Sequence, residues 1–323
     1  MNQNNSLIRN SSADNADANF TNDEIDLRDL ISVLWAGKLL IIVITTLFAI
    51  TGLVYALTQP NTYVSEATLV PAASEGRSGL AGMAAQFGGL ASLAGINLGA
   101  SGGDDTTIAL ATLESRQFIN AFITKHQLLV PLMASKKWDR STGELIVDDE
   151  LYDVETDQWV RDVDLPKKPK PSDWEAYEQF KEEVLNVSQA KDSGLVTIEV
   201  THNSPIIAQQ WATLLVEDLN AWMKQKSLME TKRNIAYLTQ QLEKTSITEM
   251  RSVFFQLIED QTKQLMLAEV ETEFSFRTID PAVVAEEKAG PKRALICALS
   301  VLLGFMLSVL IVLVRNFIYK DSN

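Results

Sequence analysis

The sequence predicts a mixed domain, α/β or α+β, that carries a long projecting helical hairpin and is anchored by two transmembrane helices. Two uncharged apolar runs near the ends of the chain predict the anchors. Short β-branched stretches between those runs predict a small sheet. A stretch from 206 to 244 that contains neither glycine nor proline predicts the long helix.

The anchors are the runs Leu39–Leu57 and Ala294–Val314, which hold 19 and 21 residues without a charge. At a rise of about 1.5 Å per residue, either run crosses a hydrocarbon core of about 30 Å. Both are apolar all round, whereas a buried core helix of this length usually carries polar residues on one face. Mostly polar, net acidic residues precede the first run, so it is interpreted as an uncleaved anchor rather than a secretory signal. Two spans leave both termini on one side and residues 58–293 on the other.

Charge and cysteine content narrow the class of partner. The formal net charge is −14 at pH 7, and most of the acidic excess lies in residues 58–293. This argues against a nucleic-acid or anionic-lipid surface and favours proteins or neutral polymers. The single cysteine, Cys297, lies inside the second span, so the domain is expected to have no disulfide. Positive charges near the two spans are balanced between the sides and do not decide the orientation.

Strands and helices are expected to alternate at the start of the large domain. The β-branched stretch Thr62–Ala72 and the alternating stretch Gly194–His202 predict two strands of one sheet. Between them, apolar residues recur at helical spacing over Thr106–Lys125 and again over Trp174–Leu185. Helices packed on a small sheet are therefore expected.

The long helix has a clear start, because Ser204 is a favoured N-cap and Pro205 a favoured first helical residue. One uninterrupted helix to Lys244 would be about 60 Å long. Its apolar face is rich early and thins later, so we expect it to leave its own core about halfway along. The segment Ser246–Glu249 offers a capping box for a second helix, and 273–280 is strand-like. This order predicts a helical hairpin that projects from a base domain.

A projecting hairpin with this much apolar surface favours self-association, since a two-helix seam covers only about half of it. The candidates for contact with another copy lie on the early face of the long helix: Trp211, Leu215, Leu219 and Trp222. In the spans, small residues at intervals of four allow helices to approach closely: Gly52, Ala56, Ser300, Gly304 and Ser308.

The glycine-rich segment 76–103 lacks the Gly-Lys-Ser/Thr ending of a phosphate-binding loop, so a nucleotide site is not expected there. Apolar residues at helical spacing indicate a weak amphipathic segment instead: Leu80, Met83, Phe87, Leu90 and Ala94. This segment could lie at the membrane surface, inside an assembly or in the core.

Signals of catalysis are few. The chain has two histidines without metal-ligand spacing and no Gly-x-Ser-x-Gly elbow. Paired carboxylates can cleave glycosidic bonds, and acidic residues cluster at Asp104 and Asp105 and from Asp148 to Glu150. Adjacent acids in an acidic domain are more often a solvated loop. No enzyme, cofactor or metal site is predicted.

Several stretches together carry a resemblance to a known family. They are "IDLRDLISVLWAGK" before the first span, "YVSEATLVPA" after it, "LESRQFINAFITKH", the long helices, and "IDPAVVAEEKAGPKRALI" running into the second span. With these features the chain resembles the Wzz-type chain-length determinants, or polysaccharide co-polymerases. Such proteins are inner-membrane homo-oligomers with cytoplasmic termini and a periplasmic domain. They set the length of lipid-linked O-antigen or a related polysaccharide made by a separate polymerase.

The resemblance implies the following division of the chain: cytoplasmic leader 1–38, first span 39–57, periplasmic base 58–203, helical arm 204–272, return strand and collar 273–293, second span 294–314 and cytoplasmic tail 315–323. Pro281 and Pro291 match the family's proline-rich segment before the second span. Ala285 stands where a further proline is expected, which makes this collar less stiff. Lys292 and Arg293 would lie at the headgroup boundary. The implied partners are other copies of the chain, the polymerase with its lipid-linked glycan, and the membrane.

Two other functions stay open at this point. A sensor with an extracytoplasmic ligand domain would need an output domain, and only nine residues follow the second span in this sequence. A glycan-active enzyme would use the acidic pairs. The leading hypothesis is a non-enzymatic regulator of chain length.

Overall fold

The structure is a computed structural model that describes residues 33–72 and 102–320. It divides into two compact units. One holds the residues up to Ala56 and from Ala294 onward, and the other is Leu57–Arg293. Most of the leader, all but the last two residues of the glycine-rich segment 76–103, and the end of the tail lie outside the described residues.

The first unit contains the two apolar helices, α2 (Lys38–Thr58) and α10 (Arg293–Lys320). Their mean hydropathies over the spanning windows are 2.5 and 2.9, and both are long enough to cross a membrane. Most of their large apolar side chains are exposed, unlike those of the core helices of the second unit. Both helices predicted from the apolar runs are therefore present.

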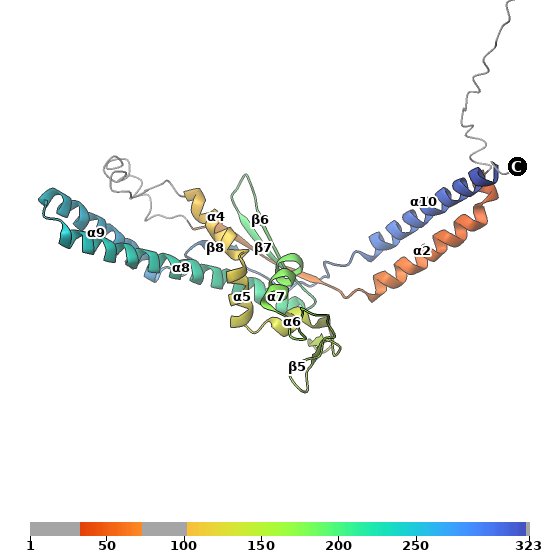
Figure 1. The fold of residues 1–323 in the computed structure, drawn as a ribbon, viewed down its shortest axis with the longest axis horizontal. Helices are drawn as coiled ribbons and strands as arrows, with labels where there is room; N and C mark the ends of the chain where they lie inside the picture. The colour runs from red at the N-terminus through yellow and green to blue at the C-terminus, as the bar shows by residue number, and fades with distance from the viewer. Residues whose placement is uncertain (1–32, 73–101, 321–323) are drawn as a thin grey trace, which may run out of the picture. The chain divides into compact units, whose positions relative to one another are not determined.

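The second unit is built on a four-stranded antiparallel sheet in the order β6-β7-β1-β8. Figure 1 labels β6, β7 and β8 of this sheet. The strands are β6 (Leu185–Gln189), β7 (Val196–His202), β1 (Tyr63–Pro71) and β8 (Phe276–Asp280). The two predicted strands pair directly, with Ala67 opposite Ile198 and Leu69 opposite Val196. Alternate residues of β1 and β7 are buried, so one face of the sheet supports the core.

Helices α4 (Gly102–Leu113), α5 (Arg116–Lys125), α6 (Leu129–Met133) and α7 (Asp173–Gln179) cover that face. The single helix predicted over Thr106–Lys125 is wrong, because the chain restarts at Ser115, whose hydroxyl accepts a hydrogen bond from the Phe118 backbone N–H at 3.3 Å. The helical stretch predicted over Trp174–Leu185 is present as α7 followed by a π-helix, η1 (Phe180–Val184), and it ends one residue earlier than predicted. Strand β6, which follows directly, was not predicted.

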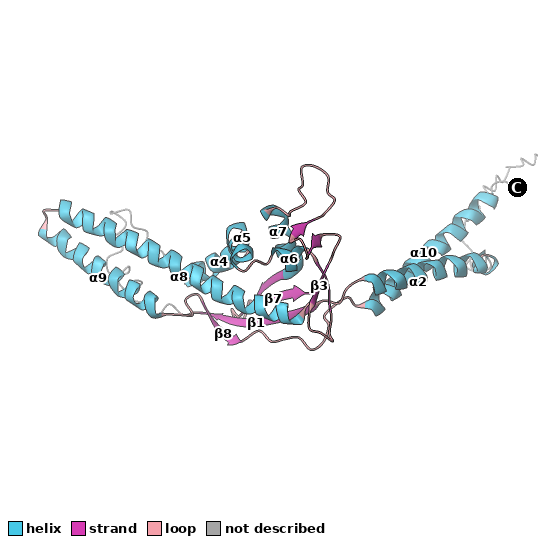
Figure 2. Cartoon of the chain, turned by 90° about the horizontal axis from the view of Figure 1, so that it is seen from below, coloured by secondary structure: helices cyan, strands magenta, loops and turns pink. Residues whose placement is uncertain are grey.

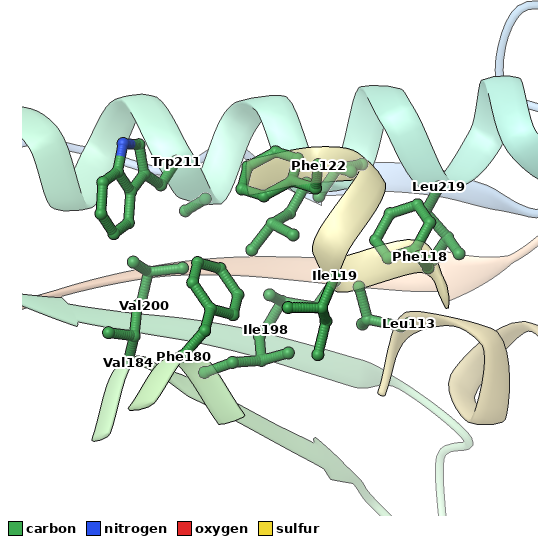
Figure 3. Packing of buried hydrophobic residues seen from close by; sticks show 14 of the residues in the cluster. Leu113, Phe118, Ile119, Phe122, Phe180, Val184, Ile198, Val200, Trp211 and Leu219 are labelled. Atoms are coloured by element: carbon green, nitrogen blue, oxygen red, sulfur yellow. The ribbon is translucent and has the colours of Figure 1, made fainter. Parts of the chain in front are cut away.

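Aromatic and branched side chains fill the space between the helices and the sheet. Figure 3 shows Phe118 and Phe122 of α5 and Phe180 of η1 packed between the long helix and the strands. Phe122 and Phe180 meet at a ring-centroid distance of 5.7 Å in an edge arrangement. The region between α6 and α7 contains two short hairpins: β2 (Ser135–Trp138) with β3 (Leu145–Val147), and β4 (Tyr152–Asp153) with β5 (Gln158–Trp159).

The long helix α8 (Pro205–Lys244) has 40 residues and begins as predicted, with the Ser204 hydroxyl accepting from the Ile207 backbone N–H. It lies along the sheet and then extends beyond it, paired with α9 (Thr248–Val270) (Figure 2). The helical hairpin and the fold class are thereby confirmed. The capping box at Ser246 does not form, because the residue before α9 is Ile247 and no side chain caps the helix.

Candidate functional site

The segment that follows β8 is held against the sheet unit along its length. The Ser65 hydroxyl donates to the Val283 carbonyl oxygen at 2.7 Å, and the Gln209 side-chain amide donates to the Ala282 carbonyl oxygen at 3.3 Å. Ala282 itself is buried in the core. The collar, residues 281–293, is therefore attached to both β1 and α8 rather than linked only through its ends.

The end of the collar pairs with the residue before β1. The Thr62 backbone N–H donates to the Gly290 carbonyl oxygen at 3.0 Å, and the Ala289 backbone N–H donates to the Thr62 carbonyl oxygen at 2.8 Å. A Cβ atom on Gly290 would lie 2.9 Å from Thr62 Oγ1, closer than a side chain tolerates without movement. Glycine thus allows the two backbones to approach closely here without displacing the Thr62 side chain.

Arg293 adds a side-chain link at the same place. Its Nη2 donates to the Gln59 carbonyl oxygen at 3.3 Å and to Asn61 Oδ1 at 3.1 Å. The neighbouring Lys292 is exposed and takes part in no such link. Of the two collar prolines, Pro281 is exposed and Pro291 is partly buried.

The small residues of the two apolar helices face one another within the chain. Gly52 is buried against Ser300, and a Cβ on Gly304 would lie 2.6 Å from Phe48 Cβ. Ala56 and Ser308 are buried as well. These contacts bring the backbones of α2 and α10 close together, which is how small residues act in membrane helices.

The four residues predicted to contact another copy are used inside the chain. Trp211, Leu215 and Leu219 are buried in the core of the sheet unit. Trp222 packs edge-on against Phe118 at a ring-centroid distance of 5.7 Å. The helices α4 to α7 and the sheet cover Trp211, Leu215 and Leu219, whereas Trp222 stays partly exposed.

Beyond Met223 the arm has a different surface. Leu238 is the one fully buried residue of α8 after that point, and no residue of α9 is buried. Several large apolar side chains of the arm are exposed: Met229, Tyr237, Ile247, Met250, Val253, Phe255, Met266, Leu267 and Val270. We call this set the arm surface.

The acidic pairs have structural surroundings. Lys136 Nζ donates to Asp148 Oδ1 at 3.1 Å and holds the pKa of that carboxyl below its ordinary value. The Glu150 backbone N–H donates to the same oxygen, so Asp148 orders the turn after β3. The side chain of Asp104 lies outside what the structure describes, and Asp105 is engaged in an interaction. Within the described ranges, no group of three or more His, Cys, Asp or Glu is suited to hold a metal ion.

Comparison with known proteins agrees with these features. Residues 23–126 match the family model "Chain length determinant protein" (Wzz), which includes α2, β1, α4 and α5. Residues 239–317 match the model "G-rich domain on putative tyrosine kinase" (GNVR), which includes α9, β8, the collar and most of α10. Residues 23–126 thus carry a chain length determinant domain.

Two solved structures are similar to this chain. One is described as "full-length bacterial polysaccharide co-polymerase", with 15% identity, a TM-score of 0.37, and coverage of 91% of this chain and 99% of that one. The other is a "Fragment of WzzB, Polysaccharide Co-polymerase from Salmonella Typhimurium", with 14% identity, a TM-score of 0.31, and coverage of 71% and 100%. No curated protein gives a significant match. The resemblance to chain length determinants therefore rests on the match of residues 23–126.

The sequence did not predict the contacts made by four residues: Gln59, Asn61, Thr62 and Gly290. Only the position of Gly290 before a proline gave a weak turn signal. Their partners lie more than 200 residues away along the chain, and no local sequence pattern predicts such a pairing.

Proposed function

We propose that this chain is a non-enzymatic, oligomeric regulator of the chain length of a lipid-linked surface polysaccharide, such as the O-antigen of lipopolysaccharide, made by a separate polymerase. The observation that carries the proposal is the match of residues 23–126 to the chain length determinant model. The two apolar helices at either end of the described chain support it, because they bracket one large unit.

The proposed site of action is the bacterial inner membrane, with both termini cytoplasmic and residues 58–293 periplasmic. Reporter fusions after Asn323 and within the leader should both read cytoplasmic, and a fusion near Asp149 should read periplasmic. A C-terminal reporter that reads periplasmic would contradict this topology.

A closed homo-oligomer is proposed because the arm surface is apolar and exposed within one chain. Nine large apolar side chains exposed on one helical hairpin favour burial against another copy of the chain. Mass measurement of the detergent-extracted protein should show several copies. A stable monomer that still shapes glycan length in cells would refute the oligomer.

The decisive experiment compares the lipopolysaccharide banding pattern of cells with and without the gene. We expect a modal band cluster in its presence and a loss or shift of that cluster in its absence. Complementation with Asp148→Asn should restore the pattern, because that carboxylate orders a turn in this proposal. A catalytic carboxylate would give a null phenotype instead.

The collar is proposed to hold the base at a fixed height above the second span. Proline fixes φ near about −65° and disfavours helix in the preceding residue, so Pro281 and Pro291 oppose extension of the span helix. We expect Pro281→Ala with Pro291→Ala to insert and oligomerise but to give a shifted or broadened glycan ladder. A matched control replaces two exposed prolines outside the collar, Pro166 and Pro169, by alanine and should leave the ladder unchanged.

A further inference from the structure

The two ends of the large unit are joined to each other by a small set of contacts that we call the clamp. On one side are Gln59, Asn61 and Thr62, and on the other Ala289, Gly290 and Arg293. Backbone hydrogen bonds of 3.0 and 2.8 Å pair Thr62 with Gly290 and Ala289, and the Arg293 guanidinium reaches Gln59 and Asn61. The chain therefore enters and leaves this unit at one place.

Arg293 is suited to this role by its shape rather than by charge pairing. Both of its acceptors are uncharged, a backbone carbonyl and a side-chain amide oxygen. A guanidinium presents several donors in a fixed plane, so it can hold two acceptors in a defined relative position. Its Nε is shielded from solvent and has no hydrogen-bond partner in the described part of the chain. The side chain is therefore packed against the protein instead of extending freely toward lipid headgroups.

Lys292, the residue directly before Arg293, provides a comparison for it. It carries the same charge, lies one position earlier and is exposed. If positive charge at the start of the second span were the only requirement, Lys292 and Arg293 would be equivalent. The structure distinguishes them, because only Arg293 reaches residues at the other end of the unit.

Gly290 allows the two backbones of the clamp to lie close together. Its backbone lies so close to Thr62 that a Cβ would approach Thr62 Oγ1 to 2.9 Å. The Ser65 hydroxyl adds a further hydrogen bond to Val283, seven residues before Gly290. The two chain segments thus lie side by side over several residues, with the clamp at their ends.

We infer that Arg293 is a positioning residue that fixes the spacing between the two ends of the domain, and that this fixed spacing contributes to the modal length of the glycan. The inference rests on the proposed function as a chain-length regulator. Without the Arg293 side chain, the two ends are held by the Thr62 backbone hydrogen bonds and the pairing of β1 with β8, so the spacing between Gln59 and Arg293 is less narrowly fixed. Loosening the clamp should therefore broaden the length distribution without removing the protein from the membrane.

The test uses the full-length chain expressed in a strain that lacks its own copy. Three variants report on the clamp: Arg293→Ala, Asn61→Ala and the two combined, with Lys292→Ala as the matched control. We expect Arg293→Ala to shift or broaden the ladder, Asn61→Ala to do so less, and Lys292→Ala to leave it unchanged. The combined variant should resemble Arg293→Ala, because residues that act through one contact are not additive.

A second readout measures the spacing directly. In a Cys297→Ser background, spin labels at Gln59→Cys and Lys288→Cys report the distance between the two ends in purified, detergent-solubilised protein. The Gln59 substitution keeps the backbone carbonyl that accepts from Arg293. A narrow distance distribution is expected for the parent and for Lys292→Ala, and a broad one for Arg293→Ala and Asn61→Ala.

Each result decides the question. Equal ladders and equal distance distributions for Arg293→Ala and Lys292→Ala would overturn the inference and favour a headgroup role for both residues. If Arg293→Ala fails to insert, Asn61→Ala still tests the clamp, because it leaves the charge untouched. If deletion of the gene changes the ladder but clamp variants do not, the inference fails and the proposed function stands. If deletion changes nothing, the proposed function itself fails.

Discussion

The two halves of helix α8 have the same backbone but different surroundings. From Pro205 to Met223 the helix contributes nine buried residues, and beyond Met223 only Leu238 is buried. The first half packs on a sheet and four helices, while the second half has α9 as its one neighbour among the described elements. A helix of this length is therefore stabilised by tertiary packing at one end and by a single two-helix seam at the other.

This difference indicates that the first half of α8 serves the fold and the second half is available for contacts with another chain. The first half of α8, which we call the base half, specifies one fold, because close-packed side chains tolerate little change. The arm half leaves apolar side chains exposed, which is costly for a solitary chain and useful for contact with a second copy. Four measurements can break or sharpen the comparison.

The largest effect is expected from Leu215→Ala in the base half. Leu215 is fully buried, and removal of such a side chain lowers the free energy of unfolding by about 2–5 kcal/mol. Urea unfolding of the full chain in detergent, followed by circular dichroism, measures the change. Met229→Ala on the exposed arm is the control and should alter stability by less than about 0.5 kcal/mol. Similar losses for the two variants would contradict the division of α8 into two halves.

The next effect tests the arm surface through Phe255→Ala. Phe255 is 56% exposed in the single chain, so the variant should fold normally. If a second copy buries this ring, each contact loses about 1.5–3 kcal/mol, which corresponds to about tenfold to more than a hundredfold weaker association. Mass measurement on dilution reports the association. The adjacent exposed polar residue offers a matched variant, Gln256→Ala, which should associate like the parent.

A smaller effect concerns the pH dependence of stability and involves His202, which lies just before the first half of α8. Burial lowers the pKa of the His202 imidazole from its ordinary value of 6.5. The neutral ring accepts from the Ser204 backbone N–H at 3.0 Å and donates to the Pro131 carbonyl oxygen at 2.9 Å. Because the folded pKa is below the unfolded one, stability is complete above about pH 6.5 and falls as the pH drops below it.

Melting temperatures measured between pH 7.5 and 5.5 should therefore decrease toward acid, and His202→Asn should flatten that slope. Hydrogen exchange should locate the loss near the first turn of α8, where Ser204 caps the helix. Faster exchange confined to the arm would show that another group is responsible.

The smallest effect is expected where the two halves meet. Lys224 Nζ donates to the carbonyl oxygens of Glu269 and Glu271 at 2.8 Å each, which satisfies acceptors at the end of α9. Lys224→Met should weaken this junction by about 1 kcal/mol. Faster amide exchange in the last turn of α9 would report it. The exposed neighbour Lys226 serves as the control position and should tolerate methionine without change.

Several elements could be predicted because their signals are local. Ser204 followed by Pro205 marks a helix start through the backbone N–H groups that only a cap can satisfy. The alternation of Val196, Ile198 and Val200 marks a strand with one buried face, and all three are fully buried. The two apolar runs needed only length and the absence of charge. In the candidate site, the prolines and the arginine of the collar were likewise visible as residue types.

Other features depended on neighbours that are distant in the sequence. The break at Ser115 was hidden because helical spacing continued across it, and strand β6 is recognised through its pairing with β7. The apolar face that contains Trp211 and Leu215 was predicted, but the helices and sheet that cover it were not. A hydrophobic stripe on a helix does not indicate which element packs against it.

The sequence by itself therefore determined strands β1 and β7, the start of the long helix, the two apolar anchors and the residues of the collar, because caps, periodicity and charge act within a few residues. The tertiary structure decided which surfaces remain exposed and that Arg293 reaches Gln59 and Asn61 instead of standing free beside Lys292. That choice depends on antiparallel pairing of β1 with β8 and β7, which brings the two ends of the unit together. Such long-range pairing is fixed by the whole core, and no short stretch of the chain encodes it.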